Sequence, residues 1–104
     1  MILQINASDV QSSDALRSHV TQAVEGALRH LADRVTRVEV HLRDDNAGKS
    51  SAFDKRVTME ARLAGHQPLV VEHATDDLYK SISEAAGKLG RAVQTKFDRL
   101  AAKA

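Results

Sequence analysis

Two stretches of alternating sequence decide the fold: residues 37–43 read RVEVHLR and residues 56–63 read RVTMEARL. In both, apolar residues alternate with charged or polar ones, which is typical of strands with one buried face. The polar segment from Asp44 to Ala52 lies between them and has the composition of a hairpin loop. We therefore predict two neighbouring antiparallel strands.

Similar patterns on either side add two more strands and two helices. Residues 2–7 and 69–73 alternate like the first two strands. Apolar residues at three- and four-residue steps predict a helix that begins near Ser13 and runs to about Arg34. The same spacing predicts a second helix within the last 28 residues.

The order strand, helix, three strands, helix predicts an α+β fold, a two-layer β-α-β-β-β-α sandwich. A right-handed crossover makes the first two strands parallel, and short turns make the last three antiparallel. Because only one face of each strand is apolar, both helices must cover the same face of the four-stranded sheet. The arrangement is like that of a double-stranded-RNA-binding domain, and we expect residues 1–104 to form a single domain.

The composition excludes several classes of protein. With 42% hydrophobic and 28% charged residues, the chain is ordinary for a globular domain. It has no cysteine, so it offers no disulfide and no thiolate nucleophile. No window approaches the roughly 18 apolar residues of a membrane span, and the N-terminus does not read as a signal peptide. We expect a cytoplasmic protein that does not bind membranes.

We expect neither enzyme activity nor a bound metal, cofactor or small-molecule substrate. The histidines are His19, His30, His41, His66 and His73. No two are four residues apart, and no His-Glu-x-x-His motif or cysteine partner is present, so metal ligation is not indicated. His73 faces the predicted core, where we expect a hydrogen-bonded structural imidazole. Asp76 and Asp77 lie at a helix start, where carboxylates cap the first turn.

The outer face of the last helix is the best candidate for a binding surface. At 100° per residue, one sector of about 100° lies opposite the apolar stripe. This sector contains Lys80, Glu84, Lys88, Arg91, Thr95 and Arg99. Four of the six are cations that can meet successive nucleic-acid phosphates on a rigid face. An ordinary solvated helix face with a Glu84–Lys88 pair explains the same pattern.

Other positions have ordinary explanations as well. The basic residues on or just after the first helix are Arg17, Arg29, Arg34 and Arg37. They border the same surface if the helices pack side by side, although interspersed acids favour ordinary surface charge. Lys55 and Arg56 can grip a phosphate or simply begin a charged strand. Gly87 and Gly90 lie inside the last helix, where we expect them to allow close helix packing.

Two segments resemble the ribosome hibernation-promoting factor family, also known as ribosome-associated inhibitors or sigma-54 modulation proteins. Residues 70–82 read VVEHATDDLYKSI and residues 88–93 read KLGRAV, and Asp-Leu-Tyr-x-x-Ile and Lys-Leu-x-Arg are their most specific marks. The resemblance covers essentially the whole chain and implies the fold derived above. The chain looks like a short form of the family, because it ends at Ala104. It also looks like a divergent branch, because Ala27 and Ala92 replace a lysine and a glutamine that are common in the family.

The resemblance implies a translation inhibitor that binds the small ribosomal subunit and its rRNA in the mRNA and tRNA channel during stress or stationary phase. Family members contact rRNA with basic residues of both helices. The matching positions are Arg17, Lys88 and Arg91, with Arg99 aligned to a family lysine. Tyr79 matches a family tyrosine, which we expect to be half-buried packing.

Two alternatives stay open. The chain can be a general double-stranded RNA binder, although its charge is low and its predicted exposed strand residues are charged and not aromatic, which argues against base stacking on the sheet. It can also be a protein-interaction module that has lost ribosome binding. In that case a weak homo-oligomer can form through the outer sheet face or an edge strand.

Overall fold

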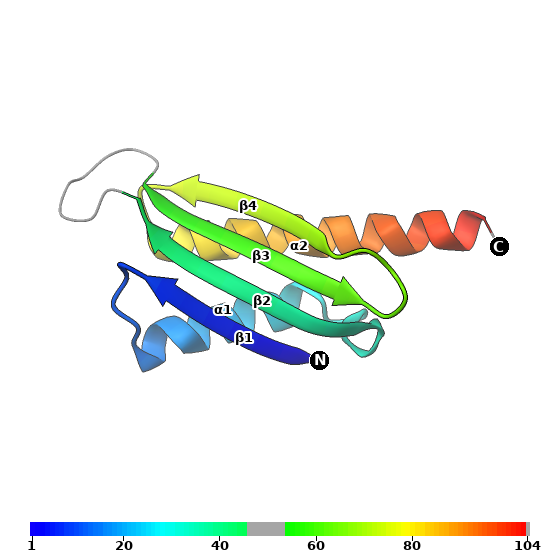
Figure 1. Ribbon diagram of the computed structural model, residues 1–104, viewed down its shortest axis with the longest axis horizontal. Helices are drawn as coiled ribbons and strands as arrows, with labels where there is room; N and C mark the ends of the chain where they lie inside the picture. The colour runs from blue at the N-terminus through cyan, green and yellow to red at the C-terminus, as the bar shows by residue number, and fades with distance from the viewer. Residues whose placement is uncertain (46–53, 104) are drawn as a thin grey trace.

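The computed structural model describes residues 1–45 and 54–103 and has the predicted order of elements (Figure 1). These are β1 (Ile2–Ser8), α1 (Asp14–Ala27), the short 3-10 helix η1 (Ala32–Arg34), β2 (Val35–Asp44), β3 (Lys55–Leu63), β4 (Leu69–Thr75) and α2 (Leu78–Ala102). The α+β class is therefore confirmed. Residues 46–52 of the expected hairpin loop lie outside the described residues.

The four strands form one sheet in the order β1-β2-β3-β4. β1 pairs with β2 in parallel, whereas β2 with β3 and β3 with β4 are antiparallel. Both helices lie on the same face of this sheet, and α2 packs against β3 and β4 (Figure 1). The predicted crossover, meander and two-layer arrangement are confirmed. No helix in the described part of the chain is long and apolar enough to cross a membrane.

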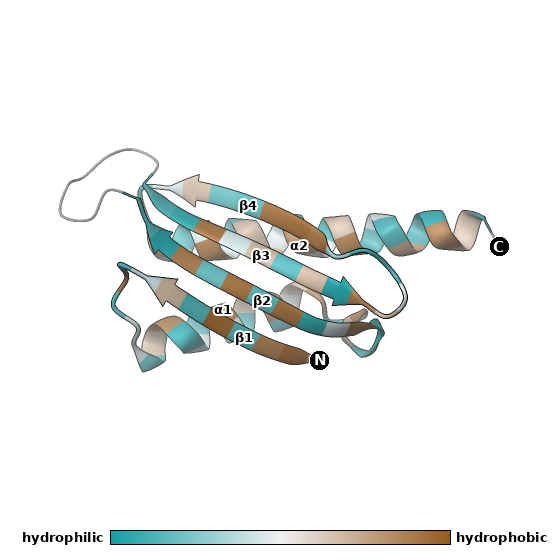
Figure 2. Ribbon diagram, in the orientation of Figure 1, coloured by the Kyte–Doolittle hydropathy of each residue, from teal (hydrophilic) through white to brown (hydrophobic). Residues whose placement is uncertain are grey.

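The core lies between the sheet and the helices. Apolar and polar bands alternate along β2 and β3, because every second side chain turns inward (Figure 2). Completely buried members include Val38, Val40, Val57, Met59, Ile82, Leu89, Val93, Val20 and Val24. Truncating such a leucine to alanine typically costs about 2 to 5 kcal/mol, so this layer holds the helices in place.

The first helix ends earlier than predicted, at Ala27 and not near Arg34. Leu28 leaves helical geometry with φ −107° and ψ 19°, and the Leu31 amide then donates to its carbonyl at 2.8 Å. Leu28 and Leu31 are nevertheless buried in the core. They continue the apolar spacing of the helix in the sequence, although the backbone there is a turn. The turn brings the chain to Val35, where β2 begins.

Both helices begin at the predicted caps. Ser13 accepts a hydrogen bond at its Oγ from the amide of Leu16 at 3.1 Å. Asp77 accepts at its Oδ1 from the amides of Tyr79 and Lys80, at 2.9 and 3.4 Å. These side chains satisfy amides that a helix leaves without partners in its first turn.

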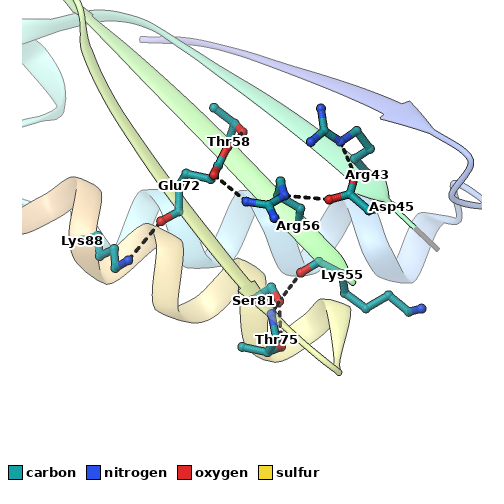
Figure 3. A network of polar contacts seen from close by, with 9 residues as sticks. All are labelled: Arg43, Asp45, Lys55, Arg56, Thr58, Glu72, Thr75, Ser81 and Lys88. Carbon is teal, nitrogen blue, oxygen red and sulfur yellow. Dashed lines mark hydrogen bonds and ion pairs between the residues drawn. The ribbon is translucent and has the colours of Figure 1, made fainter. Parts of the chain in front are cut away.

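A buried hydroxyl fixes the start of α2 against the sheet (Figure 3). Ser81 is fully buried, and its Oγ donates to the carbonyl of Lys55 at 2.7 Å and accepts from the amide of Thr75 at 3.0 Å. Breaking a bond of this kind leaves a buried polar group unsatisfied and costs about 1 to 3 kcal/mol. The contact therefore sets which side chains of α2 face outward.

Candidate nucleic-acid interface

The outer face of α2 carries cations that have no acidic partner. Lys80, Lys88, Arg91 and Arg99 are all exposed on this helix. Among the residues that the structure describes, none of the four forms an ion pair with a carboxylate. We refer to these four residues as the α2 cations. Their charge is available to an anion from outside.

The two acids on α2 are occupied elsewhere. Glu84 contacts the Nε2 atom of His73 on β4, and Asp98 accepts a hydrogen bond from Gln94 at 2.9 Å. The Glu84–Lys88 pair of the alternative explanation does not form, because Lys88 donates instead to the backbone carbonyl of Glu72 at 3.0 Å (Figure 3). His73 is half-buried and hydrogen-bonded, as predicted.

The two glycines of α2 have different roles. A Cβ atom at Gly90 would lie 2.7 Å from the carbonyl oxygen of Ala27, so this glycine lets α1 and α2 approach closely, as predicted. A Cβ atom at Gly87 would meet only the guanidinium of Arg91, at 3.3 Å. The expectation that Gly87 serves helix packing is therefore wrong. It makes room for Arg91 to lie along the helix.

Arg17 is exposed but does not join the α2 cations. Its guanidinium donates to the Oγ atom of Ser12 at 3.4 Å, in the connection that follows β1. Lys88 instead reaches β4, at the opposite edge of the sheet. The structure thus brings Lys88, Arg91 and Arg99 onto one helix and leaves Arg17 apart.

The cations on the outer face of the sheet are paired with acids. Arg56 donates to Asp45 at 2.7 Å and to Glu72 at 2.5 Å, and Arg43 also reaches Asp45, at 2.5 Å (Figure 3). The hydrogen bonds from Arg56 and Arg43 hold the pKa of Asp45 below its usual value. The hydrogen bonds that Arg56 donates to Asp45 and Glu72 raise the pKa of Arg56.

Other cations of the sheet are paired with acids as well, at the start of β3 and on the outer face near the start of β2. Lys55 donates to Asp44 at 3.0 Å, and this hydrogen bond raises the pKa of the lysine. Arg37 and Arg62 both lie 3.5 Å from the carboxylate of Glu39. Lys55 and Arg56 therefore begin a charged strand, the simpler of the two explanations for this pair.

The other basic residues near α1 differ in their surroundings. The guanidinium of Arg34 lies over the ring of Phe97, 3.7 Å from its centroid, and fastens η1 to the last turns of α2. Arg29 is exposed, beside a groove between the two helices. Sequence reasoning missed this groove, because it assigned residues 28–34 to a helix.

Sequence reasoning also missed an aromatic pair between the helices. The rings of His19 on α1 and Tyr79 on α2 lie 4.9 Å apart between centroids. Tyr79 packs there as predicted, yet 43% of it is exposed. The two residues are far apart in the chain, so no local pattern reveals the contact. The described residues contain no cluster of three His, Cys, Asp or Glu side chains that could hold a metal ion.

Comparisons with known proteins agree with this architecture. The family described as Sigma 54 modulation protein / S30EA ribosomal protein matches residues 3–101. A ribosomal subunit interface protein from Coxiella burnetii is similar in structure, with a TM-score of 0.79, 18% identity and coverage of 94% of this chain and 99% of that chain. The N-terminal domain of Protein Y from Thermus thermophilus is similar too, with a TM-score of 0.73, 24% identity and coverage of 91% and 98%. These likenesses show the shared fold. No curated protein matches the sequence.

Proposed function

Because this chain belongs to the Sigma 54 modulation protein / S30EA ribosomal protein family, we propose that it binds the small ribosomal subunit in the mRNA and tRNA channel and inhibits translation. The family consists of ribosome-associated modulation factors, which are not enzymes. On this proposal the factor acts in the cytoplasm during stress or stationary phase. It preserves idle ribosomes by occupying them.

The observation that carries the proposal is the set of α2 cations without acidic partners. A guanidinium matches two phosphate oxygens at once, and no internal ion pair has to break before Arg91 or Arg99 can meet RNA. From Lys80 to Arg99 the helix rises roughly 28 Å, which is long enough to follow several phosphates. The helix is held rigidly over much of this length by its buried stripe and by Phe97.

The proposed mechanism is occlusion. The molecule has principal extents of 51 × 24 × 19 Å, and the α2 cations lie along one helix. A rigid body of this size in a channel for RNA excludes other occupants by volume, so no bond has to be made or broken. Inhibition should then follow occupancy of the small subunit and require no further reaction.

Co-sedimentation with purified small subunits, at low and at moderate salt, tests the proposal. We expect binding that weakens with salt, because each phosphate contact releases counterions. Neutralising two phosphate contacts in Arg91→Gln/Arg99→Gln should lower the slope of log affinity against log salt by about 1.4 to 1.8. Absence of binding at both salt concentrations would contradict the proposal.

A matched control is available on the sheet. Arg43→Gln/Arg62→Gln changes the net charge equally, and these side chains are 57% and 53% exposed. Both arginines are already paired with acids, so we expect this variant to bind the small subunit like the unsubstituted chain. Equal losses in both variants would show that only net charge matters and that α2 is not the contact.

A further inference from the structure

The two helices meet along a seam that is open to the outside. His19 on α1 contacts Tyr79 and Ser83 on α2, and Ala27 lies against Gly90. Residue numbers rise in the same direction in both helices, so α1 and α2 run parallel and these contacts mark two points along the seam (Figure 1). The eight helical steps from His19 to Ala27 span roughly 12 Å.

An aromatic platform lies at one end of the seam. The Nε2 atom of His19 is 3.1 Å from both the carbonyl oxygen of Tyr79 and the Oγ atom of Ser83, which fixes the imidazole between the helices. The Tyr79 ring packs against it and remains 43% exposed. An exposed aromatic ring held in one position is the side chain on which unpaired RNA bases stack.

A cation lies along the middle of the seam. Gly87 falls between Ser83 and Gly90 on α2, and the guanidinium of Arg91 folds back over it. This guanidinium has no acidic partner among the described residues. It is therefore placed to meet a phosphate of a strand that runs along the seam from Tyr79, roughly 12 Å from the ring's helical position.

A groove of about 210 Å³ lies at the other end. Gly26 and Gly90 line it without side chains, and Arg29, His30 and Gln94 line it with polar ones. Arg29 and His30 are exposed, and neither forms a side-chain hydrogen bond or ion pair within residues 1–45 and 54–103. Such a groove offers donors to the oxygens of a nucleotide.

We propose that this seam binds a short unpaired segment of RNA. One base stacks on Tyr79, a phosphate further along the strand meets the Arg91 guanidinium roughly 12 Å along the helix, and a following nucleotide enters the groove beside Arg29 and His30. A duplex fits less well, because its bases are stacked inside the helix and cannot reach the tyrosine or the groove. The inference rests on the proposed function, which supplies ribosomal RNA as the ligand.

The tyrosine itself reports on binding. The chain has one tyrosine and no tryptophan, so intrinsic tyrosine fluorescence comes from Tyr79 alone. Titration with a short oligoadenylate should quench this fluorescence to saturation, whereas the same strand annealed to oligouridylate should quench it less. Lack of quenching by the single strand, or stronger quenching by the duplex, would overturn the seam proposal.

Two variants sharpen the test. Tyr79→Leu should weaken binding of labelled oligoadenylate by about 5- to 150-fold, from the usual contribution of stacking one base on an aromatic ring. Tyr79→Phe keeps the ring and should bind like the unsubstituted chain. Equal binding by the leucine variant and the unsubstituted chain would contradict the proposal, and thermal unfolding of each variant checks that it is folded.

Gly26→Gln fills the groove without disturbing the platform. No atom lies within 4 Å of a Cβ at Gly26, so the variant should fold and yet bind oligoadenylate more weakly. Unchanged binding would remove the groove from the proposed site.

The two proposals fail in different ways. Unaltered co-sedimentation of Tyr79→Leu with small subunits, together with no quenching by oligoadenylate, would refute the seam and leave the proposed function intact. Saturable quenching in a chain that does not bind small subunits would refute the proposed function and support the seam.

Discussion

The outer face of the sheet and the outer face of α2 both carry several basic side chains, but their charges have different uses. On the outer face of the sheet, all four arginines have carboxylate partners, and Figure 3 shows two of them, Arg43 and Arg56; the other two are Arg37 and Arg62. On α2, the cations have none among the described residues. A basic face is therefore a candidate anion site only where the acids beside it are absent or engaged elsewhere.

The difference has a geometric cause. Neighbouring strands place residues directly opposite one another, so that Thr58 pairs with Glu72 and Arg43 with Arg56 in the sheet register. On this face, positions directly opposite carry like charges where both are charged, so the ion pairs run diagonally between strands, as from Arg56 to Glu72, or along one strand, as from Arg37 to Glu39. On α2 the acids point to other groups, because Glu84 turns to His73 on β4. Its cations consequently stay free.

The largest expected effect comes from reversing charge on each face in turn. Arg91→Glu/Arg99→Glu should weaken binding to the small subunit at least about 30-fold, since a cation near a polyanionic surface contributes on the order of 1 kcal/mol. Arg43→Glu/Arg62→Glu changes the net charge equally and should leave most of the affinity. Equilibrium binding at fixed salt measures both.

The stability of these two variants should show the opposite order. Reversal on the sheet places new carboxylates beside Asp45 and Glu39, so that variant should unfold more easily. Reversal on α2 removes no ion pair and should change the free energy of unfolding by less than about 1 kcal/mol. Equal destabilisation by the two charge reversals would contradict the contrast between the faces, because it would mean that the α2 cations stabilise the fold.

The next largest effect is a difference in stability between substitutions at the two glycines of α2. Gly90→Ala forces a Cβ to within 2.7 Å of the Ala27 carbonyl, and we expect a net destabilisation of about 1 to 2 kcal/mol after the gain in helix propensity. Gly87→Ala meets only the flexible end of Arg91, so it should stabilise the helix by about 0.5 to 1 kcal/mol. Chemical denaturation measures both.

The more stable glycine variant should be the one with altered RNA binding. Gly87→Ala displaces the Arg91 guanidinium and should alter RNA affinity in a chain that is more stable. If Gly87→Ala is destabilising and leaves RNA affinity unchanged, the assignment of this glycine to Arg91 is wrong.

Much of the fold follows from local pattern. The period of two over residues 37–43 and 56–63 fixes the inward face of the strands, and the helical steps fix the buried stripes. The pattern fails at the end of α1, because Leu28 and Leu31 keep helical spacing while they are buried from a turn. Spacing reports which side chains are buried and does not report the backbone that carries them.

For the candidate site, too, the sequence predicts which side chains are exposed but not which groups they contact. The exposed position of Lys88, Arg91 and Arg99 follows from helix geometry alone, so the sequence predicts it; that they bind RNA stays a prediction. The partners of these side chains cannot be predicted from helix geometry. Lys88, for example, donates to the carbonyl of Glu72 on β4, which is 16 residues away in the chain. The pair of His19 with Tyr79 joins residues 60 apart and depends on how the helices pack.

A smaller effect tests the paired face directly. Arg56→Gln removes the cation shared by Asp45 and Glu72. Because Arg56 is only 30% exposed and joins two strands, we expect a loss of about 0.5 to 1 kcal/mol in the free energy of unfolding. Binding to the small subunit should not change. A loss of binding without a loss of stability would assign this face to RNA as well.

The smallest expected effect is the pH dependence of the stability that the ion pairs around Asp45 contribute. The pKa of Asp45 lies below its ordinary value of 3.8, because Arg56 and then Arg43 donate hydrogen bonds to its carboxylate. A carboxyl with a lowered pKa in the folded protein stabilises it above the ordinary pKa, and this contribution is lost as pH falls through the folded-state pKa. Asp45→Asn should therefore be slightly less stable than the unsubstituted chain at neutral pH, and the difference should shrink below pH 3.8. Denaturation of both proteins along a pH series measures this convergence. A difference that persists unchanged in acid would mean that the asparagine disturbs packing, and that the ion pairs on the sheet contribute nothing measurable to its stability.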